Sequence, residues 1–204
     1  MKLKIGIIDY GIGNWASIKN TLSKLGFSPI LSIDYKKIDN CDLFLLPGVG
    51  SFRPAMKEIE DRGLNKFIFE KVENKKPLIG ICLGMQLLGR SSLENEFTEG
   101  LNLISEDVLP LNNGFCHIGW NSINFVKEDP FFNLQNNDAL YFNHSYAFSS
   151  NLKYSICETN FNSQSFTSII RKDKIAGLQF HPEKSQKVGL KLLKSLIINL
   201  CSND

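Results

Sequence analysis

Short apolar runs alternate with segments of helical periodicity along the first half of the chain. The run KIGIID at residues 4–9 is short and rich in isoleucine, which predicts a buried strand. Further runs of this character lie at residues 28–33, 42–46 and 78–81. Apolar residues at helical spacing predict a helix that begins near Trp15 and ends at Gly26, and Pro54 predicts the first turn of a helix extending to about residue 73. Strands that alternate with helices predict parallel βαβ units.

The second half has a different pattern, in which short aromatic and β-branched runs are separated by Asn, Asp, Gly and Pro. These runs predict mainly antiparallel strands attached to the parallel sheet, at residues 122–126, 139–142, 154–158, 166–171 and 175–180. The chain closes on an apolar helical stripe formed by Val188, Leu192, Leu193, Leu196, Ile197 and Leu200. We therefore expect one α/β domain over residues 1–204. It should be a three-layer open mixed sheet, with a parallel first half covered by helices on both faces and antiparallel strands in the second half.

Composition argues against several classes of function. Charged residues make up 22% of the chain and the net charge is +2, so neither nucleic acid nor an acidic substrate is indicated. No apolar stretch approaches the ~20 residues that span a bilayer, and the N-terminus lacks the apolar run of a signal peptide. We therefore expect no membrane association and a cytoplasmic location. The five cysteines are scattered without a CxxC pair, so we expect no disulfide framework, no metal site and no cofactor.

The pentapeptide Gly80-Ile81-Cys82-Leu83-Gly84 stands where a predicted buried strand becomes a helix. A tight strand-to-helix turn exposes its central residue in a strained conformation, and glycines on either side relieve the crowding. Backbone amides at the start of the helix favour a thiolate, and the N–H of Leu83 points where an oxyanion would form. A small buried hydrophobe is the alternative, and it is the default for the other four cysteines. The pentapeptide alone leaves both interpretations of Cys82 open.

A nucleophilic cysteine needs a base, usually a histidine that a third group orients. His181 follows the predicted strand at residues 175–179, and Pro182 keeps the chain from entering a helix at this point. On an extended segment Glu183 would face the same side as His181 and hold its imidazole in one tautomer. A single His-x-Glu is more often a surface turn. Together with the turn at Cys82, it supports the hypothesis of a catalytic triad of Cys82, His181 and Glu183.

Several motifs of the chain narrow the chemistry. They are PGVG at residues 47–50, GICLGMQLL at 80–88, HIGWN at 117–121, YFNHSY at 141–146 and GLQFHPEKS at 177–185. The set resembles the class I, triad-type glutamine amidotransferases. With DYGIGN at residues 9–14 it is also similar to the glutaminase subunits of imidazole glycerol phosphate synthases. The resemblance runs from the first predicted strand to the last predicted helix, and the motifs keep the family's order.

The resemblance implies a role for each matching residue. Cys82 attacks the side-chain amide of glutamine, His181 protonates the departing ammonia and activates water, and Glu183 orients His181. The substrate and the oxyanion are held by the PGVG segment and by residues around the nucleophile, which are Gly48, Val49, Gly50, Leu83, Gln86, His144, Ser145 and Tyr146. For His144 a purely structural role is equally open, and His117 is expected to be structural or to face a partner.

The family pairs this subunit with a (βα)8-barrel synthase that receives the ammonia through a channel, as a heterodimer that acts in histidine biosynthesis. The positions that match partner-facing motifs are Asn14, Trp120, Asn121 and Lys184. The chain departs from the family pattern at Cys116, where a proline is usual, at Asn143, where a small apolar residue is common, and at residues 89–94. A paralogous glutaminase that serves surface-sugar biosynthesis is therefore an alternative, and a non-catalytic subunit of the same fold is a second.

Overall fold

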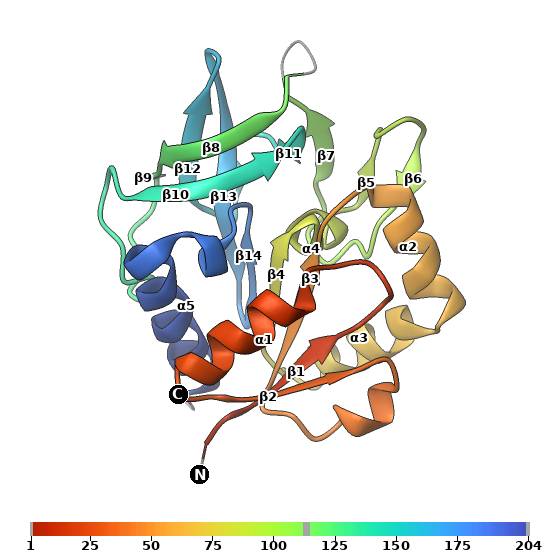
Figure 1. Ribbon diagram of the computed structural model, residues 1–204. Coiled ribbons are helices and arrows are strands. Elements are labelled where there is room, and N and C mark those ends of the chain that lie inside the picture. The colour runs from red at the N-terminus through yellow and green to blue at the C-terminus, as the bar shows by residue number, and fades with distance from the viewer. Residues whose placement is uncertain (1, 112–114, 203–204) are drawn as a thin grey trace.

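An eight-stranded mixed sheet runs through the molecule in the computed structural model, which describes residues 2–111 and 115–202 (Figure 1). Its parallel part contains, in spatial order, β2 (Ser28–Ser32), β1 (Lys4–Ile8), β3 (Leu43–Gly48), β4 (Leu78–Cys82) and β14 (Ile175–Leu178). Antiparallel strands continue the sheet as β13 (Gln164–Lys172), β12 (Ser155–Phe161) and β9 (Asn124–Phe125). The expected mixed sheet is therefore confirmed.

Helices cover both faces of the sheet and enclose two apolar clusters. The first cluster packs β1, β3 and β4 against α1 (Trp15–Lys24) and α5 (Gln186–Cys201). The second packs the opposite face against α2 (Phe52–Asp61), α3 (Leu64–Glu73) and α4 (Leu83–Leu87). Residues of one strand alternate between the clusters, as Leu43 and Leu45 belong to the first and Phe44 and Leu46 to the second. This alternation is why the strands are apolar along their whole length.

Two expectations about the elements are wrong. The single helix predicted from Pro54 to about residue 73 is two helices, because Gly63 between α2 and α3 adopts a φ of 66° that turns the chain. The strand predicted at residues 175–180 is β14, which ends at Leu178 and lies parallel to β4 while pairing antiparallel with β13. The parallel sheet therefore includes one strand from the second half of the chain.

Two small sheets stand on the main one. Strands β8 (His117–Ser122) and β10 (Ala139–His144) form an antiparallel pair. Strands β11 (Tyr146–Phe148), β7 (Asp107–Pro110), β5 (Ser91–Ser92) and β6 (Thr98–Glu99) form the other. Within the described residues, Tyr35–Lys37 and Pro182–Lys184 form two 3-10 turns. The β8–β10 pair lies above the upper ends of β4 and β14 in Figure 1, so it closes over the carboxyl ends of these strands.

The register of the parallel strands brings three loops to one edge of the sheet. Gly48 at the end of β3 is paired with Cys82 at the end of β4, and Leu178 at the end of β14 is paired with Ile81. The segments that follow these strands therefore emerge side by side. Crevices at the carboxyl ends of parallel strands are the usual ligand sites of open α/β sheets.

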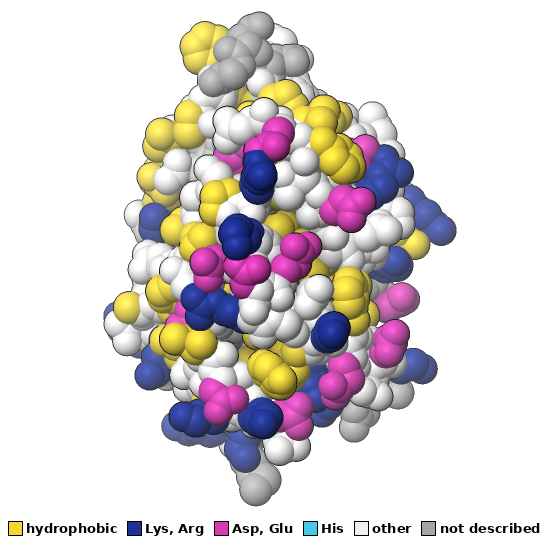
Figure 2. Space-filling model, turned by 90° about the vertical axis from the view of Figure 1, so that its right-hand side faces the viewer, with side chains coloured by type: hydrophobic (Ala, Val, Ile, Leu, Met, Phe, Trp, Pro, Cys, Tyr) yellow, Lys and Arg dark blue, Asp and Glu magenta, His cyan; other side chains and the backbone are white. Residues whose placement is uncertain are grey.

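The molecular surface around α2 carries charges of both signs. Figure 2 shows basic and acidic side chains interspersed with small apolar areas on the face that lies to the right in Figure 1. On α2 these charges pair at i,i+4 spacing, as Lys57 with Asp61 and Glu58 with Arg62. Among the described residues, no helix is long and apolar enough to cross a membrane.

The turn after β4 depends on Gly84, and we predict that Gly84→Ala destabilises the fold strongly. A Cβ at this position would overlap the carbonyl oxygen of Leu46 in β3, which is backbone and has little freedom to move. The expected loss is about 3 kcal/mol or more of unfolding free energy, measured by urea denaturation. Gly26→Ala is the matched control, because its φ of 93° is unfavourable for alanine but nothing lies within 4 Å of the added atom. It should lose only about 1–2 kcal/mol, and equal losses for both variants would contradict the packing argument.

Candidate active site

The strand-to-helix turn at residues 80–84 holds Cys82 in a strained conformation. Cys82 ends β4 and caps α4 with φ of 53° and ψ of −113°, a region that side-chain-bearing residues rarely occupy. The glycines on either side permit the turn, since a Cβ at Gly80 would lie 2.6 Å from the carbonyl oxygen of Gly84. Such strain persists only where the surrounding packing imposes it, and it is often found at functional positions.

His181 is fixed to the β8–β10 pair through its backbone. Its N–H donates to the carbonyl of Tyr141 at 2.8 Å, and the Ser185 hydroxyl donates to the His181 carbonyl at 2.7 Å. The same hydroxyl accepts from the Tyr141 N–H at 2.9 Å, so Ser185 links the two segments. Because Ser185 is fully buried, these bonds are shielded from water and hold the segment after β14 against β10.

Glu183 contacts His181, although the local structure differs from the expected extended segment. Residues Pro182–Lys184 form a 3-10 turn, and His181 itself is the extended residue that precedes it. The turn still brings the carboxylate back to the ring, and His181 Nδ1 lies 2.9 Å from Glu183 Oε1. Both side chains are nearly inaccessible, at 3% and 2% exposure. The imidazole is therefore oriented by a buried carboxylate.

The charge state of His181 follows from its neighbours. Burial lowers its pKa, but hydrogen bonding and charge from Cys82 and Glu183 more than offset burial and raise the pKa to about 10. The imidazolium form is therefore favoured at neutral pH, between a thiol group on one side and a carboxylate on the other. This arrangement is the one that a cysteine nucleophile and its acid–base partner require.

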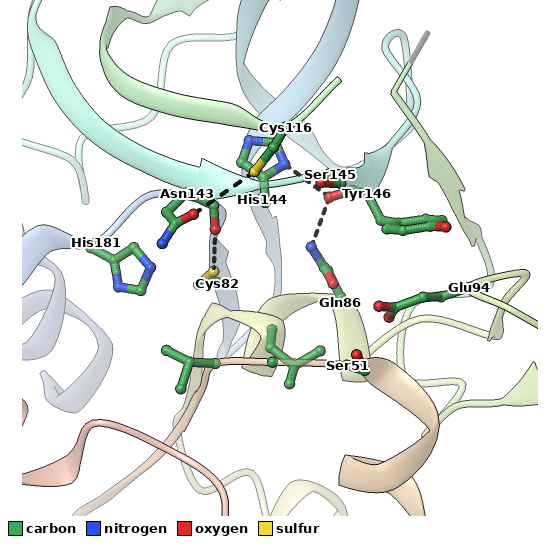
Figure 3. A pocket seen from close by; sticks show the side chains of 13 residues that line it. Ser51, Cys82, Gln86, Glu94, Cys116, Asn143, His144, Ser145, Tyr146 and His181 are labelled. Atoms are coloured by element: carbon green, nitrogen blue, oxygen red, sulfur yellow. Dashed lines mark hydrogen bonds between the residues drawn. The ribbon is translucent and has the colours of Figure 1, made fainter. Parts of the chain in front are cut away.

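These groups open into a pocket of about 290 Å³. Figure 3 shows Cys82 and His181 at one end, with Gln86 and Glu94 farther along and His144, Ser145 and Tyr146 on the opposite wall. Most of the substrate and oxyanion residues expected from the sequence line it, namely Val49, Gly50, Leu83, Gln86, His144, Ser145 and Tyr146. Gly48 lies behind the pocket, where it lines a small cavity with Asn14, His181 and Glu183.

Gln86 is held by a buried network. Its side-chain amide donates to the carbonyl of Tyr146 at 2.7 Å and to Gln179 Oε1 at 3.2 Å. The amide of Gln179 in turn lies 4.0 Å from the Cys82 sulfur. Because both amide hydrogens of Gln86 are engaged, its oxygen Oε1 is the group that remains for a ligand.

Sequence reasoning missed several residues of the site. Glu94 lines the pocket, and its carboxylate accepts the Phe52 N–H at the start of α2 at 2.7 Å. Asn143 lies over Cys82, with its backbone carbonyl oxygen 3.7 Å from the Cys82 sulfur. Ser51 and Cys116 also line the pocket. The departures from the family pattern marked Cys116, Asn143 and the segment that includes Glu94, but only the fold shows that all three meet.

The residues expected to face a partner divide into two groups. Trp120 and Lys184 both contact the Tyr141 ring, at centroid distances of 6.1 Å and 5.6 Å, and Trp120 is 48% exposed. Asn14 is also exposed, beside the small cavity behind Glu183. Asn121 differs, because its side-chain amide donates to the Asn160 carbonyl at 2.9 Å and its oxygen accepts the Ser122 N–H at 2.8 Å. Its polar groups are therefore engaged within the chain.

Sequence comparison places the chain among known proteins. A model of the glutamine amidotransferase class-I family matches residues 6–200. The chain belongs to this family. A relative from Caldanaerobacter subterraneus, an imidazole glycerol phosphate synthase subunit HisH, is 41% identical over 197 residues that cover 94% of this chain and 96% of the relative. Subunit HisH 2 of the same synthase from Methanococcus maripaludis is 43% identical, with coverage of 95% and 98%.

Solved structures confirm the fold of this family member. PurLQS from Thermotoga maritima superposes with a TM-score of 0.78 at 20% identity, over 98% of this chain and 100% of that one. A glutamine amidotransferase from the same organism gives a TM-score of 0.74 at 17% identity, over the whole of both chains. At these identities the likeness concerns the fold.

The three histidines should titrate very differently, and NMR of their imidazole groups measures this. The pKa of His181 is raised to about 10, so its ring should stay charged through the neutral range. Burial lowers the pKa of His117 to about 4, and burial with neighbouring positive charge lowers that of His144 to about 3, so both should stay neutral above pH 5. Cys82→Ser should lower the pKa of His181 alone. Three titrations near the ordinary value of 6.5 would contradict this electrostatic picture.

Proposed function

We propose that this chain is the glutaminase subunit of an imidazole glycerol phosphate synthase. It hydrolyses glutamine to glutamate and ammonia, and passes the ammonia to a (βα)8-barrel partner that acts in histidine biosynthesis. The observation that carries the proposal is a strained cysteine beside an imidazole that a buried carboxylate orients, at one end of a pocket. The family assignment and the relatives of about 40% identity support the same conclusion.

The reaction starts with the Cys82 thiolate and the His181 imidazolium. The sulfur attacks the side-chain carbonyl carbon of glutamine, and the negative charge that forms on oxygen is accepted by backbone N–H groups of Leu83 and the PGVG segment. His181 gives its proton to the amide nitrogen, the carbon–nitrogen bond breaks, and ammonia leaves. Water then attacks the thioester while His181 takes its proton. The carbon–sulfur bond breaks, which releases glutamate and restores the starting ion pair.

The pocket also suits the other end of glutamine. Among its lining residues, which all lie in the described part of the chain, Glu94 is the acidic side chain. Its carboxylate is held toward the pocket by the Phe52 N–H, at the opposite end from Cys82 (Figure 3). We assign it to the α-ammonium group of the substrate. Gln86, His144, Ser145 and Tyr146 form the walls between these two ends.

The ammonia must reach its acceptor without entering bulk water, because free ammonia becomes ammonium at neutral pH. Trp120 is a large exposed aromatic on β8, and with Tyr141 and Lys184 it forms a surface next to His181. Aromatic residues are enriched at protein interfaces. We assign this surface, with Asn14 beside it, to the barrel partner.

Cys82→Ala should separate the two half-reactions. With the barrel partner present, glutamine-dependent synthesis should fall below detection because the nucleophile is absent, while synthesis from added ammonium salt should persist because the partner's chemistry is untouched. Cys201→Ala, a change at the end of α5, is the matched control and should keep both activities. Loss of both activities in Cys82→Ala would overturn the assignment of Cys82.

The same pair of variants distinguishes the pathways in cells. The wild-type gene and Cys201→Ala should restore growth of a histidine auxotroph that lacks its own glutaminase subunit, and Cys82→Ala should not. Failure of the wild type to complement, together with active glutamine hydrolysis in vitro, would favour the surface-sugar paralogue. Absence of hydrolysis with every partner would favour the non-catalytic subunit.

Glu94→Gln should weaken glutamine binding selectively. Removing the negative charge eliminates the pairing with the α-ammonium group but retains a hydrogen-bond acceptor for the Phe52 N–H. A charged hydrogen bond of this kind is worth about 1.5–3 kcal/mol, so KM for glutamine should rise roughly tenfold to a hundredfold while kcat changes little. Glu99→Gln on exposed β6 is the control, with no expected change. An unchanged KM for Glu94→Gln would remove Glu94 from the binding site.

A further inference from the structure

A chain of buried hydrogen bonds connects strand β8 with the wall of the pocket. His117 on β8 is paired in register with His144 on β10. His117 Nδ1 lies 3.2 Å from His144 Nε2, and His117 Nε2 lies 3.2 Å from the side-chain nitrogen of Asn121. At the other end, His144 Nδ1 lies 2.9 Å from the Tyr146 carbonyl oxygen. His144 lines the pocket, and His117 lies one layer behind it.

The groups at both ends of this hydrogen-bond chain determine which ring nitrogen of each histidine carries the hydrogen. The Tyr146 carbonyl only accepts, so His144 Nδ1 carries the hydrogen and Nε2 of the neutral ring is an acceptor. His117 Nδ1 must therefore donate to His144, which leaves His117 Nε2 to accept from Asn121. The Asn121 amide is held in the matching orientation, because its nitrogen also donates to the Asn160 carbonyl and its oxygen accepts the Ser122 N–H. Each donor thus meets an acceptor in a single arrangement.

The surroundings keep both histidines neutral and ordered. The His117 ring is stacked between Phe142 and Phe161, at centroid distances of 4.7 Å and 4.2 Å. Both histidines are buried, at 3% and 6% exposure, and burial lowers their pKa values well below neutrality. A buried polar group that loses its partner is destabilising, so the ring of His144 has a strong preference for the orientation that His117 satisfies.

The end of the hydrogen-bond chain that lies at the pocket reaches groups that would surround the substrate. The Tyr146 carbonyl that accepts from His144 also accepts from Gln86 at 2.7 Å, and Gln86 contacts Gln179, which lies against the Cys82 sulfur. The outer end of the hydrogen-bond chain lies on β8 next to Trp120, which is exposed. A displacement of β8 would therefore change the hydrogen bonds that hold His144, Tyr146 and Gln86.

We propose that His117 is a positioning residue for glutamine hydrolysis. It holds His144 in the tautomer and orientation that fix the Tyr146 carbonyl and, through it, Gln86, and it links this wall of the pocket to the exposed strand β8. This role rests on the proposed glutaminase function. It differs from plain packing because it requires the two hydrogen bonds of the ring and not only its shape.

The test compares variants of His117 in the complex with the barrel partner. His117→Phe keeps a stacked ring but removes both hydrogen bonds, so KM for glutamine should rise about tenfold while ammonia-dependent synthesis is unchanged. His117→Asn retains a donor near the position of Nδ1 and should recover most of the wild-type KM. Thr159→Val is the control, because it changes a buried hydroxyl without a hydrogen-bond partner on the neighbouring β12 and should leave KM unchanged.

Asn121→Leu is a second test of the role proposed for His117, and it replaces His117→Phe if that variant does not fold. It keeps both histidines but removes the donor to His117 Nε2, so KM should rise about threefold. The NMR signal of His144 Nε2 should shift in both variants, since its hydrogen bond is lost or weakened. Wild-type KM in His117→Phe or, where that variant is unfolded, in Asn121→Leu would overturn the inference. Absence of glutamine hydrolysis by the wild-type complex would instead overturn the proposed function.

Discussion

The close approach of α4 to the ends of β3 and β4 is the constraint on which the site depends. Gly84 lies against the Leu46 carbonyl with no room for a side chain, and Gly80 lies under the Gly84 carbonyl. This contact lets the chain reverse within one residue, and that residue, Cys82, takes the positive φ. A larger residue at either glycine would push α4 away from the sheet and relax the turn. The strained backbone at Cys82 is therefore a consequence of the packing between backbone atoms of α4, β3 and β4.

Strand β14 brings His181 to the same edge of the sheet. It lies parallel to β4 although it comes from the second half of the chain, so the segment after it emerges beside Cys82. Ser185 then ties this segment to Tyr141 of β10, which closes over the pocket. Cys82, His181 and Glu183 thus lie on two segments whose relative position is determined by a strand register and by one buried hydroxyl.

Sequence alone predicted most of the framework, because the strong signals are local. Apolar runs, glycines around Cys82 and the motif at His181 each depend on neighbours along the chain. The parallel pairing of β14 was not predictable in this way, since it is decided by which strand lies beside β4. The break at Gly63 was missed because the apolar spacing continues across it. Glu94 and Gln179 were missed because their roles depend on contacts with residues 42 and 97 positions away, Phe52 and Cys82.

The three buried histidines of this molecule have pKa values shifted in opposite directions, because their neighbours differ. All three rings are nearly inaccessible to solvent, so desolvation disfavours the charged form of each. At His181 a carboxylate and the sulfur of Cys82 reverse this effect, and the pKa of the ring is raised to about 10. At His117 and His144 the neighbours are aromatic rings, an amide and a carbonyl, so the rings stay neutral and act through fixed hydrogen bonds. The same residue type is therefore charged at neutral pH on one side of the pocket and neutral, within fixed hydrogen bonds, on the other.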